Sequence, residues 1–271
     1  MTIVYCCGVN LMSQFIIHNK GEARKLLLLA ILAGRIMLRN GAETYRVEDT
    51  IERIIKSRKN IKYADAFVTP TGIFASLEYE EEVLTYLIRI KAIRINLNKI
   101  NLVNDFSREF VSTNMSIDGG IKKLRMIDNT ETYSPLFKSL FGALSCGFLS
   151  ILFGGSMLDF ISSIFVSFFV VLVVNRINRY KLTFFINNFI GAIIATFLSI
   201  LITVIGIADN MNTVIIASIM PLVPGVAITN AMRDTISGDF VSGLSRAMEA
   251  IFSALSIAFG VGLVLNIYLG G

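Results

Sequence analysis

Two prolines, a glycine and a group of polar side chains follow an apolar run near the end of the chain, in MPLVPGVAITNAMRDTISGD at 220–239. A proline removes a backbone N–H and crowds the carbonyl four residues back, so a helix that continued through Pro221 and Pro224 would lose about 3 kcal/mol or more at each. Lipid cannot hydrogen-bond the freed backbone groups, which must therefore face protein or a water-filled cavity. The pattern predicts a discontinuous membrane helix, interrupted at Pro221, Pro224 and Gly225, whose ends can bind a polar solute. A proline kink without any ligand is the alternative.

Charged and polar side chains lie close to this break in the sequence. They are Thr229, Asn230, Arg233, Asp234, Asp239, Arg246 and Glu249. A charge in hydrocarbon costs about 2.5–3.5 kcal/mol at mid-helix, so such residues usually face a cavity or a partner. Arg233 and Arg246 are natural counter-charges for an anionic solute, and the nearby acids would serve a zwitterion. A purely structural ion pair of Arg246 with Glu249, three residues apart on one helix face, is the competing interpretation.

Charge is distributed very unevenly along the 271 residues. Residues 1–135 hold 34 of the Lys, Arg, Asp and Glu residues, and 136–271 hold 11. The first part has the charge and the size of one soluble domain, and the second is a membrane domain. The predicted fold is therefore an α-helical multi-pass membrane protein with an N-terminal cytoplasmic α+β domain. We divide the chain into a tail at 1–19, the cytoplasmic domain at 20–135 and the transmembrane domain at 136–271.

Within the first part, helical spacing runs from about Lys20 to Ser57 and is expected to break near Gly41. The nine apolar residues LLLLAILAG are too few to cross a bilayer, which takes about 20. The runs YADAFVT and GIFASLEY, joined through Pro70 and Gly72, predict a β-hairpin. LTYLIRI predicts a third strand. Helical spacing returns at 96–110 and at 116–128, where Ser116 or Asp118 is the expected cap.

Five apolar segments follow, at about 136–153, 157–174, 184–207, 212–228 and 244–268. The connections GGSM and ADNMN carry no Lys or Arg, whereas NRINRYK carries three and AMRDTISGD one. The positive-inside rule then places the N-terminal domain in the cytoplasm and the C-terminus outside, in a plasma-membrane protein. Four spans with a re-entrant segment at the prolines would return the C-terminus to the cytoplasm. Asp159, close to an outer connection, is expected to be an interfacial carboxylate.

Several classes of function are disfavoured. The net charge of +5 is too diffuse for a nucleic-acid partner, although a basic surface could contact anionic lipid. Three unevenly spaced cysteines, at 6, 7 and 146, and a single histidine, His18, give neither a zinc site nor a disulfide framework. No nucleotide-binding GxxxxGK[ST] and no GxSxG occurs, so we expect no cofactor and no enzyme. A hydrolase-like domain using Glu43 and Glu48, or a regulatory subunit, stays as the alternative.

Four ordered segments resemble the threonine/serine exporter family. They are GAETYRVEDTIERI (41–54), TPTGIFASL (69–77), NKINLVNDFSRE (98–109) and PLVPGVAITNAMRDTISGDFVSGLSRAMEAI (221–251). The resemblance is to the larger subunit of the split, two-component type, because single-chain members continue with further membrane helices after this region. It implies a secondary exporter of threonine or serine, or of dicarboxylates such as succinate, that works with a small second membrane subunit. Coupling to the proton gradient is expected.

The resemblance also marks individual positions. In the N-terminal part these are Gly41, Glu43, Thr44, Arg46, Glu48, Pro70, Thr71, Gly72, Asn104, Arg108 and Glu109. In the membrane part they are Pro224, Gly225, Asn230, Asp234, Gly238, Asp239, Gly243 and Arg246. From spacing alone, Glu43, Arg46 and Thr50 share one helical stripe with Arg53, which predicts a polar face for packing, gating or solute capture. Glycines 142, 154, 191, 260 and 262 would allow close helix approach in a homo-oligomer.

Overall fold

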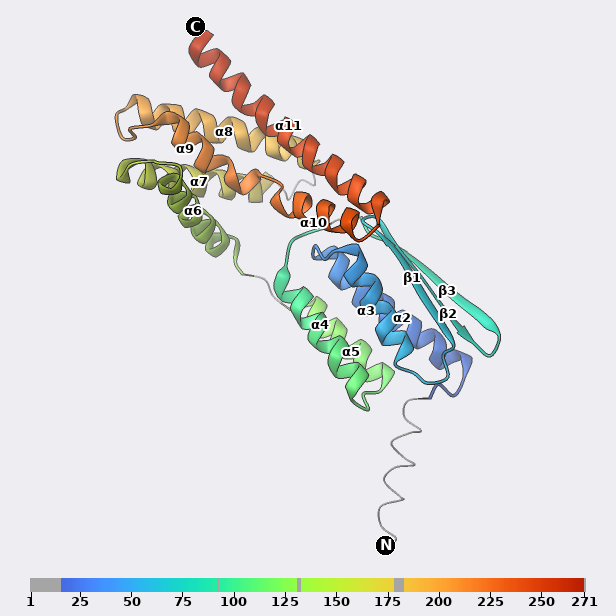
Figure 1. Cartoon of the computed structure of the whole chain (residues 1–271). Coiled ribbons are helices and arrows are strands. Elements are labelled where there is room, and N and C mark those ends of the chain that lie inside the picture. Colours follow the sequence, from blue (N-terminus) through green and yellow to red (C-terminus); the bar gives the residue numbers. More distant parts are fainter. Residues whose placement is uncertain (1–15, 92, 131–132, 178–182, 271) are drawn as a thin grey trace. The chain divides into compact units, whose positions relative to one another are not determined.

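The computed structural model describes residues 16–91, 93–130, 133–177 and 183–270. The described residues form two compact units (Figure 1). One, here called the α+β unit, holds the chain up to Thr132 together with Thr229–Arg246; the other, the helical unit, holds Tyr133–Ile228 and Ala247–Gly271. The predicted tail lies largely outside the described residues, as do Cys6 and Cys7.

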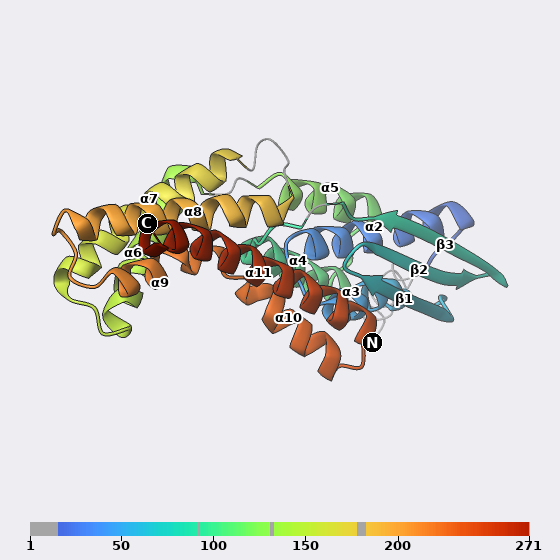
Figure 2. The ribbon, with the colours of Figure 1, turned by 90° about the horizontal axis from the view of Figure 1, so that it is seen from above.

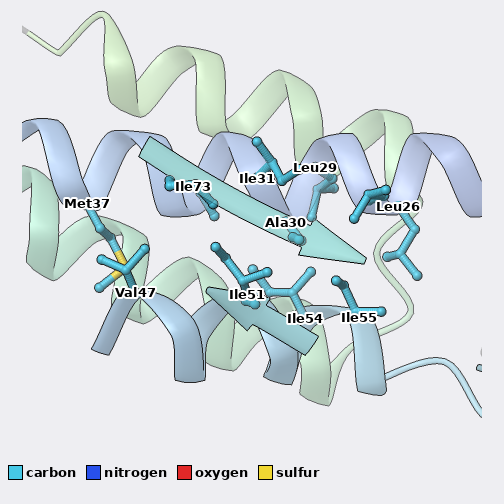
Figure 3. Packing of buried hydrophobic residues seen from close by; sticks show 14 of the residues in the cluster. Leu26, Leu29, Ala30, Ile31, Met37, Val47, Ile51, Ile54, Ile55 and Ile73 are labelled. Carbon is cyan, nitrogen blue, oxygen red and sulfur yellow. The ribbon is translucent and has the colours of Figure 1, made fainter. Parts of the chain in front are cut away.

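The α+β unit is built on two helices, α2 (Lys20–Arg39) and α3 (Thr44–Lys56). Their buried faces form one apolar core with the inner face of the sheet (Figure 3). A Cβ on Gly34 would lie 2.5 Å from Ile51 Cδ1, so this glycine lets α2 and α3 approach closely. The expected break between them is confirmed: Gly41 has a φ of +92°, a conformation that L side chains rarely adopt.

Three antiparallel strands lie in the order β1 (Tyr63–Thr69), β2 (Gly72–Tyr79) and β3 (Glu82–Arg89). β2 is the central strand, as Figure 2 shows. Every second residue of β1 is buried, which is the pattern of a sheet covered on one face. The hairpin through Pro70 and the third strand are therefore both confirmed.

Two more helices complete this unit, α4 (Leu97–Ser112) and α5 (Ile117–Asp128). Both contact α2, and Phe106 and Phe110 of α4 are among the largest fully buried side chains. Of the two expected caps for the second helix, Ser116 is the one found, because its side chain accepts a hydrogen bond from the backbone N–H of Gly119.

The helical unit begins with three apolar helices, α6 (Pro135–Leu152), α7 (Met157–Ile177) and α8 (Phe184–Val204). Each is long and apolar enough to cross a membrane, and so is α11 (Phe240–Gly270). Much of their surface is exposed apolar side chain, including Phe148 at 63% and Phe165 at 53%, as expected of helices that contact lipid rather than water.

The predicted discontinuity at the prolines is present. α9 (Met211–Ile219) runs into a 3₁₀ turn, η2 (Met220–Leu222), and a new helix, α10 (Gly225–Ile236), starts after Pro224. The two helical segments are bent by 58°. The described residues thus contain four helices able to span a membrane, or five spans if the bent pair is one of them.

A charged cluster at a helix break

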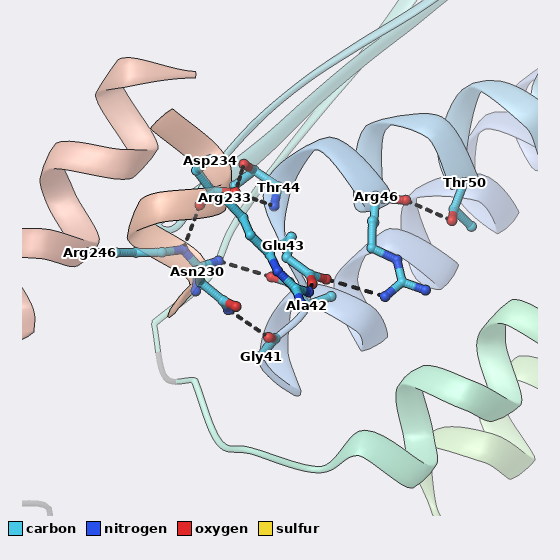
Figure 4. Close-up of polar contacts among 10 residues, drawn as sticks. All are labelled: Gly41, Ala42, Glu43, Thr44, Arg46, Thr50, Asn230, Arg233, Asp234 and Arg246. Carbon is cyan, nitrogen blue, oxygen red and sulfur yellow. Dashed lines mark hydrogen bonds and ion pairs between the residues drawn. The ribbon is translucent and has the colours of Figure 1, made fainter. Parts of the chain in front are cut away.

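The break between α2 and α3 exposes carbonyl groups that no longer belong to a helix. Side chains from α10 and α11 bond to two of them (Figure 4): Asn230 Nδ2 donates to the Gly41 carbonyl over 3.0 Å, and Arg246 Nη2 donates to the Ala42 carbonyl over 2.9 Å. Both donors are buried, at 5% and 4% exposure. The segment 229–246 therefore satisfies backbone groups more than 180 residues away in sequence.

The start of α3 binds a carboxylate. Asp234 Oδ1 accepts from the Thr44 backbone N–H at 3.2 Å and from its hydroxyl at 2.9 Å. A helix N-terminus carries unpaired N–H groups and a partial positive charge, so a carboxylate is stabilised there. Thr44, which the family resemblance marks, is thereby linked to Asp234, which lies next to the proline break in sequence.

Asp234 also forms a buried ion pair with Arg246. Arg246 Nε lies 3.0 Å from Asp234 Oδ2, and the two side chains are 5% and 0% exposed. The contact is not aligned as a hydrogen bond, so it holds mainly by charge. The alternative expectation, a pair of Arg246 with Glu249, is wrong: Glu249 is exposed, and the buried guanidinium is instead neutralised by Asp234.

The Thr44 hydroxyl lies between two carboxylates. It is 2.9 Å from Asp234 Oδ1 and 3.0 Å from Asp239 Oδ2. A hydroxyl has one proton, so it donates to only one of them at a time. Asp239 is held by a further bond, because its Oδ1 caps the start of α11 by accepting from the Ser242 N–H at 3.1 Å.

Glu43 joins the cluster to a more exposed arginine. Its carboxylate pairs with Arg233 of α10 and lies 3.5 Å from Arg46. Burial by itself raises the pKa of Glu43, but its backbone hydrogen bond and the two guanidinium groups outweigh burial and hold the pKa below its ordinary value. The Glu43 side chain is 9% exposed and that of Arg233 is 55% exposed. Arg233 and Arg46, whose side chains are 55% and 43% exposed, are therefore the exposed cations beside Glu43, whereas Arg246 is buried.

Glu48 lies one turn beyond Thr44 on α3. Its Oε1 accepts from the Val68 backbone N–H of β1 at 2.8 Å. Burial raises the pKa of Glu48; the Val68 bond opposes this, and the negative charge of Asp239 adds to it. Arg53, the last residue of the predicted stripe, pairs with Asp49 on the exposed surface of α3.

The other marked positions of the α+β unit lie outside this cluster. Pro70, Thr71 and Gly72 form the turn between β1 and β2, where the Ile90 N–H donates to the Thr71 carbonyl. Among the recorded contacts of the described residues, Glu109 of α4 pairs with Lys123, and none links Asn104 or Arg108 to the cluster. The second motif thus contains the turn between β1 and β2, and the third lies on α4.

Gly243 and Gly238 let α10 and α11 meet. A Cβ on Gly243 would lie 2.2 Å from Thr235 Oγ1 and 3.1 Å from the Ala231 carbonyl, and Gly238 has a φ of +90° in the turn between the helices. A side chain at either position would disturb the segment that carries Asn230 and Asp234.

In the helical unit, Asp159 lies in the first turn of α7 and is buried by protein, at 1% exposure. Its Oδ2 accepts from the Ser156 N–H, and its Oδ1 accepts from the N–H groups of Asp209 and Asn210. It is therefore a structural group that ties two connections together. Three further hydroxyls, those of Ser162, Ser163 and Ser218, are buried without a recorded hydrogen bond.

Sequence reasoning missed the groups that receive the cluster's hydrogen bonds. Ala42 and Ser242 lie inside the first and fourth motifs but are not among the marked positions, and Val68 lies outside all four motifs. They contribute through the Ala42 carbonyl, the Val68 N–H, and the N–H of Ser242 with its contact to the Val68 carbonyl. The pattern Asp-x-x-Ser before an apolar run could have identified Asp239 as a helix cap. Within the described residues, no group of three or more His, Cys, Asp or Glu side chains could hold a metal ion.

Helices able to cross a membrane, a small α+β unit and a charged segment after a broken helix define a multi-pass membrane protein. Residues 28–268 match the family model described as "Putative threonine/serine exporter", and the chain belongs to this family. It is 22% identical over 244 residues to a "Probable threonine/serine exporter" of Mycobacterium tuberculosis, an alignment covering 89% of this chain and 46% of that protein. It is 21% identical over 256 residues to "Probable succinate transporter subunit YjjP" of Klebsiella aerogenes, covering 93% of this chain and 97% of the relative.

The chain thus spans about half the length of the mycobacterial relative and nearly all of the Klebsiella one. No solved structure matches this chain. The family and both names concern transport, which confirms the expectation of a transporter-family membrane protein.

Proposed function

We propose that this chain is one subunit of a secondary exporter for threonine, serine or a small dicarboxylate, and that residues 229–246 form its gating segment. The observation that carries the proposal is the arrangement of this segment. It follows a broken apolar helix, and its side chains bond to the α2–α3 break through Asn230, Asp234 and Arg246. A solute carboxylate has the chemistry to compete for these guanidinium groups.

The contacts of Asp234 support five membrane crossings rather than four. Thr44 and Asp234 are hydrogen-bonded, so they lie on the same side of any membrane that the chain crosses. Three apolar helices, α6, α7 and α8, lie between them in sequence and make an odd number of crossings. A crossing by the bent pair α9–α10 is then needed to return the chain to the side of Thr44, and a re-entrant pair would leave Asp234 on the wrong side.

Helix lengths agree with this count. Residues 211–228 amount to 18, close to the lower limit of about 17 for a span. α11 has 31 residues and is about 46 Å long, against about 30 Å for the hydrocarbon layer. Its first turns, up to Arg246, belong to the α+β unit, and the remainder is long enough to cross. The basic connection after α7 favours the cytoplasm for the side that holds Thr44.

The cluster offers a stepwise route for a solute. Arg233 is half exposed and held by Glu43, so an arriving carboxylate meets this guanidinium first. Arg246 is buried and held by Asp234. Replacing Asp234 at Arg246 by a solute carboxylate would release the Thr44 N–H and hydroxyl as well, loosening segment 229–246 from the α2–α3 break. In this gating step, binding of the solute to Arg246 directly releases the contact between Asp234 and Arg246.

Protons are the proposed coupling ion. Glu48, Asp234 and Asp239 lie around Thr44, with one hydroxyl proton available between the two aspartates. The buried, unpartnered hydroxyls of Ser162, Ser163 and Ser218 supply polar groups inside the helical unit that a solute or water could bond to.

A second subunit is part of the proposal, because the Klebsiella relative is named a transporter subunit. The test is efflux from proteoliposomes that contain this chain with the small membrane protein encoded nearest to it. Labelled threonine, serine and succinate are loaded, with and without a pH gradient. We expect one of them to leave faster than from liposomes with either protein alone, and faster still with the gradient. Equal rates in all preparations would refute the exporter proposal.

A further inference from the structure

The outer edge of the sheet at β3 lacks the features that protect edge strands from pairing. β3 has eight residues, EVLTYLIR, with neither proline nor lysine among them. Its register with β2 continues without a bulge from Gly72↔Arg89 to Tyr79↔Glu82. Natural edges are usually blocked by such residues or by bulges, since a bare edge is a template for another strand. Figure 2 shows that no further strand of the described chain lies beyond β3.

The opposite edge, at β1, is protected. The backbone N–H of Val68 donates to Glu48, and its carbonyl lies 3.5 Å from the hydroxyl of Ser242. Side chains of α3 and α11 therefore occupy edge groups of β1. Side chains thus cover the β1 edge at Val68, whereas no hydrogen bond to the outward backbone groups of β3 is found among the described residues.

The turn before β3 determines which backbone groups point outward. Glu80 and Glu81 form a two-residue turn with φ values of 50° and 64°, so Tyr79 and Glu82 are the closing pair of the hairpin. Alternation along the strand then directs the N–H and C=O groups of Val83, Thr85, Leu87 and Arg89 to the free edge. The side chains of Val83 and Leu87 are 64% and 55% exposed.

We propose that β3 pairs antiparallel with β3 of a second copy, about a two-fold axis at Thr85, to form a continuous six-stranded sheet. A two-fold axis perpendicular to the sheet keeps each face on its own side and makes the contact self-complementary. Centred on Thr85, it places Val83 opposite Leu87 and brings Arg89, at the end of one β3, towards the turn residue Glu81 of the other copy. The first is an apolar pair and the second an ion pair, both favourable across strands.

Charge complementarity favours a second copy as the occupant. Glu81 and Arg89 are both exposed and take part in no ion pair recorded for the described residues. Glu81, in the turn, and Arg89, at the other end of β3, are each four residues from Thr85, so reversing the strand brings opposite charges to the same end. This inference uses no feature of the charged cluster and is independent of the transported solute.

Cross-linking across the proposed axis tests the pairing. The full chain, with cysteines 6, 7 and 146 replaced by serine, receives a single cysteine at Thr85 and is oxidised in its native membranes. Cα atoms of directly opposed residues in a hydrogen-bonded pair are about 5.5 Å apart, within reach of a disulfide. The matched control is Ser76→Cys, one strand inward in the same row. Its copies would be about 14 Å apart, three strand spacings, and out of reach.

We expect at least a tenfold higher yield of disulfide-linked homodimer for Thr85→Cys than for Ser76→Cys. Equal yields, or a Thr85 disulfide to a different protein, would overturn the proposal. A second variant, Thr85→Pro, removes only an outward N–H, and Thr85→Val retains it. The proline variant should halve the particle mass in detergent while the valine variant should not; a dimer that survives the proline contradicts the pairing.

Discussion

The buried pair of Asp234 and Arg246 gives a quantitative prediction for the α+β unit. Asp234→Asn would leave a guanidinium at 4% exposure with no carboxylate 3.0 Å away. Removing one partner of a buried ion pair costs about 3–5 kcal/mol. Since every 1.4 kcal/mol is a factor of ten, the α3 backbone should open about 10²- to 10⁴-fold more often.

Hydrogen–deuterium exchange of α3 peptides in the detergent-solubilised chain measures this opening, because exchange from a folded helix reports its opening free energy. The cycle is completed with Arg246→Met and with the double variant, in which neither charge stays buried. We expect the double variant to be more stable than the sum of the two single losses predicts, by roughly 1 kcal/mol or more. Strict additivity, or less than a tenfold change for Asp234→Asn, would refute the description of Asp234 and Arg246 as a coupled buried pair.

Three further predictions concern titration, the proline break and topology. The pKa of Glu48 is raised above its ordinary 4.5. Its contribution to stability is therefore full below about pH 4.5 and is lost as the pH rises through the raised value. Glu48→Gln should abolish this loss, as measured by hydrogen exchange of β1 from pH 4 to 8, and an unchanged dependence of exchange on pH would contradict the prediction. Pro224→Ala should allow a continuous helix, leave membrane insertion intact and lower efflux severalfold, whereas parental efflux would make the break a packing kink. Cysteines introduced at Ser156 and Asn210 should react with an impermeant thiol reagent added to the extracellular side. A cysteine at Asn178, which is not among the described residues, should not react. The reverse pattern would invert the topology.

Local signals in the sequence were sufficient for most elements. Gly41 marked the helix break because only a residue free to adopt a positive φ fits there, and Pro70 and Gly72 marked the hairpin turn. Proline spacing located the discontinuity before α10. These features depend on a few adjacent residues, so composition and spacing were enough to predict them.

The partners of the charged residues could not be predicted in this way. Helical spacing paired Arg246 with Glu249, three residues on, whereas the fold supplies Asp234 from another helix. The bond between Thr44 and Asp234 joins residues 190 apart, and periodicity contains no information on such a contact. The receiving groups are also backbone atoms, such as the Ala42 carbonyl, whose availability follows from where a helix ends rather than from residue type.

Arg233 is proposed to receive the solute in a functioning exporter. The most direct test is the initial rate of labelled-solute efflux from proteoliposomes that contain this chain and its partner. The comparison is between wild type and Arg233→Gln. Arg233 is 55% exposed, and Arg46 stays beside the buried Glu43 in the variant, so the fold should be retained; α3 exchange checks this in the same samples. We expect efflux of threonine, serine or succinate by the wild type, and an efflux rate at least tenfold lower for Arg233→Gln at low solute concentration. Equal rates for the two proteins, or no efflux of any of the three solutes by the wild type, would contradict it.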